Sequence, residues 1–105
     1  MIRSEVKAEE PVRVVARLIA REDSIEAVRA VVTALVEPSR SEQGCVSYEL
    51  LHNSADECDF TVVEEWETAA TLDAHFETAH FQEAAKKLQG ILACAPDIRR
   101  YRQIA

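Results

Sequence analysis

The middle of the chain contains two strand-like runs that are joined by only a few polar residues. The runs are CVSYELLHN at residues 45–53 and FTVVEEWE at residues 60–67, and both are rich in β-branched and aromatic side chains. The connection between them, SADECD, is a polar turn that is too short for a crossover. The two runs therefore predict an antiparallel hairpin, and any fold proposed for this chain has to contain it.

One strand and one helix are expected before this hairpin. The run VRVVARLIAR at residues 12–21 is rich in β-branched residues and predicts a strand. Apolar residues then recur at helical spacing over residues 24–37, which predicts an amphipathic helix that Asp23 or Ser24 can cap. We expect Pro38 to bend or end this helix.

Two helical segments and a strand are expected after the hairpin. Thr68 is a suitable N-cap for a helix that runs through Phe76, and Thr78 can cap a further helix. Pro96 closes the helical region, and DIRRYRQI at residues 97–104 predicts a last strand. The order is β-α-β-β-α-β, so we expect an α+β, ferredoxin-like fold whose antiparallel sheet carries helices on one face only.

The opposite face of that sheet is expected to mix apolar and charged side chains. The residues on it are Val15, Ile19, Leu51 and Val63 among Arg17, Glu49 and Glu65. Burying the apolar groups is favourable by roughly 25 cal/mol per Å², and the charges can pair across strands. We therefore expect two sheets to pack face to face in a symmetric homodimer.

Length and charge limit the classes of partner. The 105 residues suit one domain, which we assign to residues 11–105 after a polar N-terminal arm at residues 1–10. The formal net charge of −7 repels nucleic-acid phosphates and anionic membrane surfaces, so we expect neither as a partner. The N-terminus has no apolar segment of the kind that secretory signals contain.

The three cysteines indicate a reducing compartment. Cys45, Cys58 and Cys94 are odd in number and widely spaced, which argues against a disulfide framework and a structural zinc site. We expect them to be small buried side chains with inert thiols in a cytoplasmic protein.

Residues 64–81 gather the only Trp and two of the three His beside a pair of carboxylates. Trp66 ends the third predicted strand, where the chain turns into the helix that carries His75. His75 and His80 are five residues apart, which on one helix leaves their side chains roughly 140° apart. We therefore expect no two-histidine metal site there, and each histidine is most often packed or capping at such a position, with a general base or ligand as the other interpretation.

The acidic and tyrosine side chains leave both structural and functional interpretations open. Glu64 and Glu65 face opposite ways on a strand, so they cannot act as an acid and base pair from one face. Tyr48 and Tyr101 can each offer a hydroxyl to a pocket or serve as core aromatics with a solvated tip. The sequence contains no nucleotide-binding fingerprint and no nucleophile elbow.

The order of these features resembles the antibiotic biosynthesis monooxygenase family. The resemblance covers about residues 12–104 and rests on LVEPSRSEQGCVSYEL at residues 35–50, followed by FTVVEEWET and LDAHFETAHF. Its most specific positions are Glu42, Gly44, Cys45, Tyr48, Glu64, Trp66, His75, His80 and Phe81. The resemblance implies a dimeric α+β barrel with a site between the sheet and the helices.

The family includes cofactor-independent monooxygenases, quinol oxidases, haem-degrading enzymes and an isomerase of a phosphorylated ketone. The resemblance implies that Trp66 lines the site, and that His75 matches the helix histidine that ligates haem in the haem-degrading branch. That branch also uses an Asn on the first strand, whereas the only Asn of this chain is Asn53. This departure weakens the haem interpretation.

We therefore expect a monooxygenase that oxidises a small phenol or hydroquinone with O₂ and needs no cofactor and no metal. Its site residues are predicted as His75 and Trp66 for catalysis, with Tyr48, Glu64, Phe76 and His80 contacting the small aromatic substrate. His75 would act as the base or stabilise the substrate anion, and Trp66 would stack on the substrate or donate to it. The alternatives are a non-catalytic dimer that binds a metabolite, a haem-degrading oxygenase and an isomerase of the same fold.

Overall fold

The computed structural model describes residues 10–105, so the N-terminal arm expected over residues 1–10 lies, apart from Glu10, outside the described residues. The helices and strands follow the predicted order, with the second helical region divided in two. They are β1 (Val12–Ile19), α2 (Ile25–Arg40), β2 (Cys45–His52), β3 (Asp59–Trp66), α3 (Ala69–Phe76), α4 (Ala79–Leu88) and β4 (Asp97–Tyr101).

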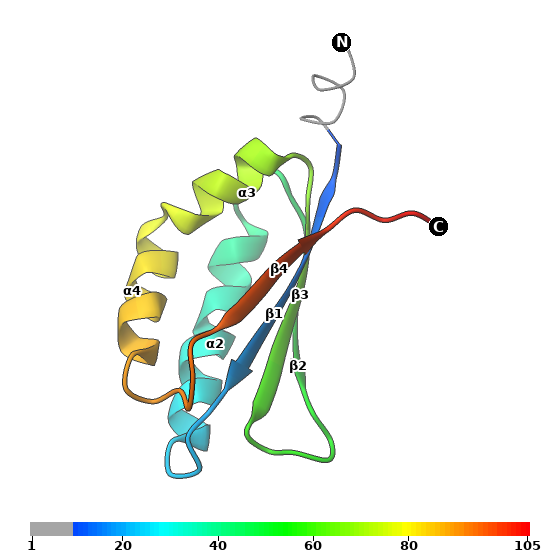
Figure 1. The fold of residues 1–105 in the computed structure, drawn as a ribbon. Coiled ribbons are helices and arrows are strands. Elements are labelled where there is room, and N and C mark those ends of the chain that lie inside the picture. The colour runs from blue at the N-terminus through cyan, green and yellow to red at the C-terminus, as the bar shows by residue number, and fades with distance from the viewer. Residues whose placement is uncertain (1–9) are drawn as a thin grey trace.

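The four strands form one antiparallel sheet in the order β2-β3-β1-β4. The three helices cover one face of this sheet and leave the other face bare (Figure 1). This arrangement confirms the predicted α+β, ferredoxin-like fold. None of the described helices is long and apolar enough to cross a membrane.

The central hairpin has the predicted pairing, with one irregularity that the sequence pattern did not indicate. The register between β2 and β3 shifts between Cys45 and Ser47, as in a β-bulge. Beyond the bulge Tyr48 pairs with Glu64, so both side chains lie on the face that the helices cover. The bulge therefore decides which β2 side chains point towards the helices.

The core lies between the sheet and the helical layer. Alternate residues of β1 and β3 pack against the apolar face of α2, as their two-residue and 3.6-residue periods predict. The almost fully buried residues of this core include Val14, Val28, Val32, Phe60, Val62, Trp66 and Leu72.

The helix α2 begins as predicted but ends later than predicted. Ser24 occupies its N-cap, although its hydroxyl donates to Asp23 at 2.9 Å and makes no capping bond, and the helix continues through Pro38 to Arg40. A proline removes one helical hydrogen bond, but other contacts hold this last turn. Arg40 Nε donates to the carbonyl of Tyr48 at 3.0 Å, and the backbone N–H of Ser41 donates to the carbonyl of Glu37 at 3.1 Å.

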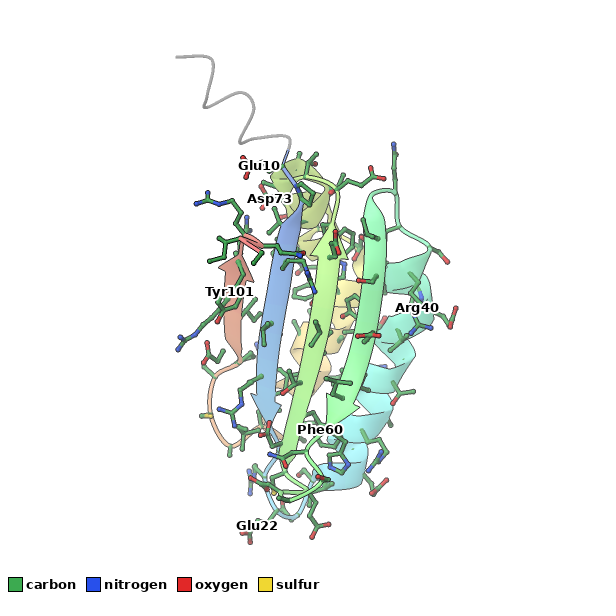
Figure 2. The ribbon with its side chains drawn as sticks, turned by 90° about the vertical axis from the view of Figure 1, so that its right-hand side faces the viewer. Glu10, Glu22, Arg40, Phe60, Asp73 and Tyr101 are labelled. Carbon is green, nitrogen blue, oxygen red and sulfur yellow. The ribbon has the colours of Figure 1, made fainter. Side chains whose placement is uncertain are left out.

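The bare face of the sheet carries the predicted mixture of side chains (Figure 2). Val15 and Val63 are neighbours on β1 and β3, and both are half-buried in the protomer. An ion pair joins Arg17 to Asp59 at 2.9 Å on the same strands. The homodimer that would cover this face stays a prediction.

Candidate functional site

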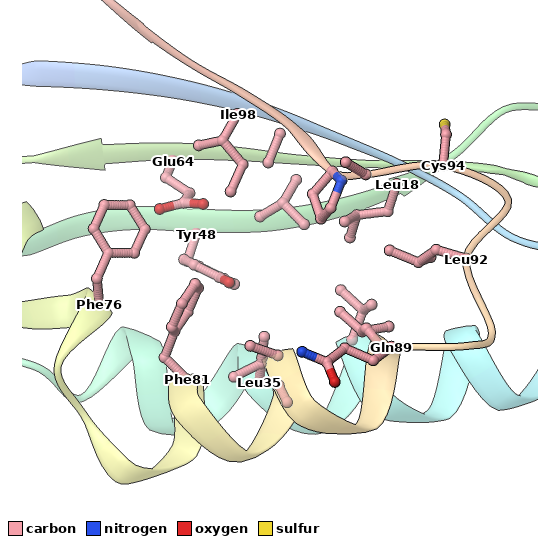
Figure 3. Close-up of a pocket in the computed structure, with 18 of the residues that line it drawn as sticks. Leu18, Leu35, Tyr48, Glu64, Phe76, Phe81, Gln89, Leu92, Cys94 and Ile98 are labelled. Carbon is pink, nitrogen blue, oxygen red and sulfur yellow. The ribbon is translucent and has the colours of Figure 1, made fainter.

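A cavity of about 530 Å³ lies between the sheet and the helices (Figure 3). This volume is within the usual range of small-molecule sites. Side chains from both layers and from the segment after α4 line it, and most of them are apolar. The lining includes Leu18, Leu35, Val62, Phe76, Phe81 and Leu92.

Glu64 is the only carboxyl among the described residues that line this pocket. Its side chain belongs to the buried face of β3 and is 5% exposed. The indole Nε1–H of Trp66 donates to Oε1 of Glu64 at 2.8 Å. Burial raises the pKa of Glu64 to about 7, although the bond from Trp66 acts in the opposite direction. The carboxyl can therefore hold or release a proton near neutral pH.

Aromatic side chains surround this carboxyl. Tyr48 faces Glu64 across the hairpin and is 3% exposed, and burial raises the pKa of its phenol above the ordinary value. The rings of Phe76 and Phe81 meet edge to face with their centroids 5.0 Å apart. Figure 3 shows Tyr48, Phe76 and Phe81 at the end of the pocket where Glu64 lies, and Cys94 at the other end.

The two predicted catalytic residues lie together behind this lining. The ring centroids of Trp66 and His75 are 4.8 Å apart, and the two side chains are 0% and 1% exposed. Neither residue is part of the pocket lining. His75 instead meets the lining rings of Tyr48 and Phe81 edge to face, with centroids 5.8 and 5.1 Å away.

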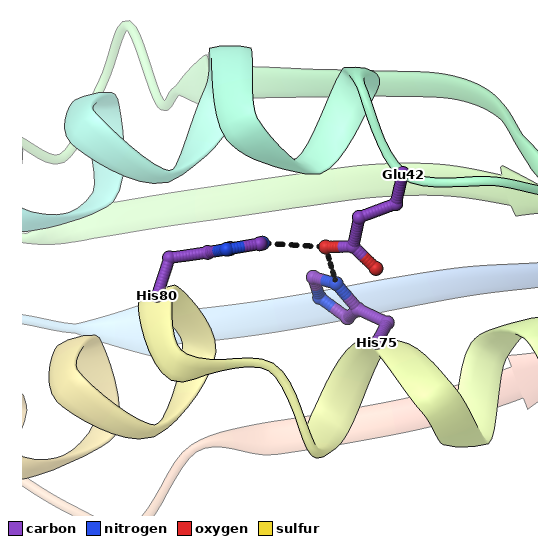
Figure 4. A group of neighbouring side chains, drawn as sticks. All are labelled: Glu42, His75 and His80. Carbon is purple, nitrogen blue, oxygen red and sulfur yellow. Dashed lines mark hydrogen bonds and ion pairs between the residues drawn. The ribbon is translucent and has the colours of Figure 1, made fainter.

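Glu42 joins the two histidines of residues 64–81 (Figure 4). Its Oε2 atom lies 2.7 Å from Nδ1 of His75 and 2.5 Å from Nε2 of His80. The Nε2 atom of His75 is buried and has no hydrogen-bond partner among the described residues. Burial lowers the pKa of His75, and this outweighs the opposing effect of Glu42. We call Glu42, His75 and His80 the Glu-His-His cluster.

The predicted separation of the two histidines is wrong because they do not share a helix. Thr78 divides the helical region by donating its hydroxyl to the carbonyl of His75 at 2.7 Å and accepting from the N–H of Phe81 at 3.3 Å. His75 therefore lies at the end of α3, and His80 lies in the first turn of α4. The change of direction between the helices turns both rings towards Glu42.

Gly44 brings the loop that carries Glu42 onto α3. Its φ of +90° favours glycine, and a Cβ there would lie 2.4 Å from Cγ2 of Thr71. The carbonyl of Gly44 also accepts from the N–H of Glu67 at 2.8 Å. The sequence prediction did not include Glu42 among the site residues, although the Glu-x-Gly-Cys pattern was a signal for it.

The remaining predicted residues are divided between the pocket and its surroundings. Tyr48, Glu64 and Phe76 line the pocket, whereas His80 does not. Tyr101 is 48% exposed on β4 and lies outside the lining.

The cysteines depart from their predicted burial. All three are free, but Cys94 is exposed and lines the pocket, and Cys45 and Cys58 are only half-buried. The expectation of three buried thiols is therefore wrong, and Cys94 departs from it most, because the segment after α4 borders the pocket instead of packing into the core.

Comparisons with known proteins agree with the fold and identify the family. The profile of the antibiotic biosynthesis monooxygenase family matches residues 11–87. The uncharacterised protein sll1783 of Synechocystis is 34% identical over 95 residues, which are 90% of this chain but only 65% of that protein. The solved structure of Rv0793 from Mycobacterium tuberculosis covers 91% of this chain and 97% of its own, with a TM-score of 0.87 and 26% identity. PA3566 from Pseudomonas aeruginosa, at 30% identity, also gives a TM-score of 0.87 over 93% of this chain and 98% of its own. The chain therefore belongs to the antibiotic biosynthesis monooxygenase family.

Proposed function

We propose that the pocket binds a small aromatic molecule with an ionisable hydroxyl and promotes its monooxygenation by O₂. The observation that supports this proposal most strongly is the Glu64 carboxyl, whose pKa of about 7 sets it apart in an otherwise apolar, aromatic pocket. Membership of the family supports the same class of reaction. The electrons come from the substrate itself, so the reaction needs no prosthetic group.

The first step is transfer of the hydroxyl proton to Glu64. A phenol has a pKa near 10, so its anion forms only transiently beside a carboxyl of pKa about 7. A positioned base nevertheless lowers the barrier, because general-base catalysis typically contributes roughly 10²–10⁴-fold. The buried hydroxyl of Tyr48, which stays neutral, can donate a hydrogen bond to the substrate oxygen.

The second step is oxidation of the anion by O₂. The phenolate passes one electron to O₂, and the two radicals combine to form a carbon–oxygen bond at a ring carbon that carries hydrogen. One oxygen atom remains on that carbon as a quinone carbonyl. The other oxygen leaves as water with the two hydrogens that the substrate loses from its O–H and C–H bonds. Apolar walls exclude water from the reacting anion.

Trp66 and His75 act in this proposal from behind the pocket. Trp66 holds the Glu64 carboxyl through its Nε1–H, and His75 packs on the indole. Both are positioning residues here, because neither of them is part of the pocket lining. Phe76 lines the same end and supplies an aromatic surface against which the substrate ring can pack.

The haem interpretation does not fit this arrangement. The residue that would ligate haem, His75, is 1% exposed and is not part of the pocket lining. Its Nδ1 atom is engaged by Glu42. The first strand also lacks the Asn that the resemblance requires.

Oxygen uptake with a panel of naphthols and hydroquinones tests the proposal. Glu64→Gln keeps an oxygen that can accept from Trp66 but removes the base, so we expect turnover to fall at least ~10²-fold. Glu65→Gln is the matched control, because Glu65 lies on the opposite face of β3 and is paired with Arg13 at 3.8 Å. The control should keep turnover within about twofold.

Two results would reject the proposal. Equal turnover in Glu64→Gln and wild type would show that Glu64 is not the base. Tight binding of the aromatic panel without any oxygen consumption would favour the non-catalytic metabolite-binding dimer instead.

A further inference from the structure

We propose that the Glu-His-His cluster is a binding site for a divalent transition-metal cation of the Zn²⁺ class. This inference is independent of the proposed oxygenation, which uses no metal. It rests on side chains from three segments of the chain whose ligand atoms point at one place (Figure 4).

The three ligand atoms already converge. The possible donor atoms of Glu42, His75 and His80 all lie within 4.8 Å of one another, and both imidazoles approach the same carboxylate oxygen. Glu42 comes from the loop after α2, His75 from the end of α3 and His80 from the start of α4. Such convergence from separate segments is the geometry that a tightly held cation requires.

Small movements would admit the ion. Zinc binds nitrogen and oxygen at about 2.0–2.2 Å, which places neighbouring tetrahedral ligand atoms roughly 3.3–3.5 Å apart. The two Glu42 contacts of 2.7 and 2.5 Å would therefore lengthen by about 1 Å or less. The imidazole centroids are 6.2 Å apart, so the two rings would also approach each other by about 1 Å to reach the ~5.2 Å of two rings on one tetrahedral ion.

The donor set selects the class of metal. Two imidazole nitrogens and one carboxylate suit Zn²⁺ and its neighbours Co²⁺, Ni²⁺ and Cu²⁺, whereas Mg²⁺ and Ca²⁺ prefer oxygen ligands. Three protein ligands also leave one tetrahedral position for water or a small anion. The same combination of two histidines and one glutamate occurs in zinc sites that keep an open position.

The site can be reached from solvent without entering the aromatic pocket. His80 is 28% exposed in its side chain and lines a separate surface groove beside Glu83 on α4. Glu42 is 12% exposed, whereas His75 closes the inner side of the cluster at 1%. A cation would therefore enter past His80 and tie the loop after α2 to both α3 and α4.

Titration of the metal-free protein with Zn²⁺ in a calorimeter, and with Co²⁺ in a spectrometer, tests the site. We expect one ion per chain and a Co²⁺ spectrum without a thiolate charge-transfer band, which separates the cluster from the three free cysteines. Glu42→Gln and His80→Ala should each weaken binding at least ~10-fold, since loss even of outer-shell partners costs 10–100-fold. Circular dichroism of each variant verifies that it is folded.

His52→Ala is the matched control, because His52 lies at the end of β2 and is bonded to the carbonyl of Glu57, outside the cluster. It should bind the ion as wild type does. Three results would overturn the proposal: no binding by folded wild type, a thiolate band with Co²⁺, or equal loss of affinity in His52→Ala and His80→Ala.

Discussion

Glu64 occupies a strand position whose neighbours on the same face, Val62 and Trp66, are almost fully buried. A carboxylate at such a position loses its hydration, and one hydrogen bond from Trp66 compensates only in part. The result is a carboxyl that keeps its proton up to about pH 7. The burial that raises the pKa of Glu64 for its proposed role as a base therefore also makes the free energy of unfolding depend on pH.

The raised pKa of Glu64 predicts a pH-dependent stability. The folded protein binds this proton more tightly than the unfolded chain, whose value is near 4.5. The contribution is fully present below about pH 4.5 and is lost as the pH rises through about 7. Between pH 4.5 and 8 this group should lower the free energy of unfolding by an amount on the order of 3 kcal/mol.

Urea unfolding at a series of pH values measures this effect. Glu64→Gln should flatten the dependence between pH 5 and 8 by roughly that amount, whereas Glu65→Gln should follow wild type. If wild type and Glu64→Gln had the same pH dependence, the carboxyl would not titrate in the raised range.

At the scale of elements, the Glu-His-His cluster depends on two interruptions of regular structure. Thr78 separates α3 from α4, and Gly44 allows the loop after α2 to contact the start of α3. Together the two interruptions bring His75 and His80 within hydrogen-bond distance of Glu42, although they are 33 and 38 residues from it in the sequence.

Gly44→Ala is predicted to disturb this contact strongly. The new Cβ would meet Thr71 at 2.4 Å in a backbone conformation that alanine rarely adopts. Strain and overpacking each cost about 1–3 kcal/mol, so we expect a loss of about 2–5 kcal/mol in the free energy of unfolding.

Gly90→Ala is the control for this change, because Gly90 has a φ of +85° but no atom within 4 Å of the added Cβ. Its cost should be limited to backbone strain, about 1–2 kcal/mol in denaturant unfolding. Equal losses in the two variants would show that the contact with Thr71 does not constrain the loop.

These elements also show what the sequence could predict. The hairpin, the caps at Thr68 and Thr78, and the buried faces of the strands follow from local spacing and turn chemistry, and the structure has them. The position of Glu42 beside the two histidines depends on how separate segments pack, which local periodicity does not encode. The path of α2 through Pro38 likewise depends on tertiary contacts of its last turn.

At the scale of the whole molecule, the sheet has one covered and one bare face (Figures 1 and 2). The bare face places the half-buried Val15 and Val63 beside Leu51, which is 49% exposed. The dimer that the resemblance implies would remove this apolar surface from water, at roughly 25 cal/mol per Å².

Val63→Asp is predicted to convert a dimer to a monomer, because it places a charge at the centre of the face near Glu49 and Glu65. Sedimentation equilibrium measures the change in mass. Ala79→Asp is the control with the same added charge, at an exposed position in the first turn of α4. A wild-type protein that sediments as a monomer at high concentration would contradict the predicted dimer.

The most direct test of the assignment of Glu64 as the proton acceptor is the pH dependence of oxygen uptake, measured as kcat/KM with the best aromatic substrate. For wild type we predict a rate that rises with pH and levels off above about 7, as the Glu64 carboxyl loses its proton. Glu64→Gln should be slow and should lack this rise, whereas Glu65→Gln should retain it. A rise of the same midpoint and height in Glu64→Gln would contradict the assignment of Glu64 as the group that accepts the substrate proton.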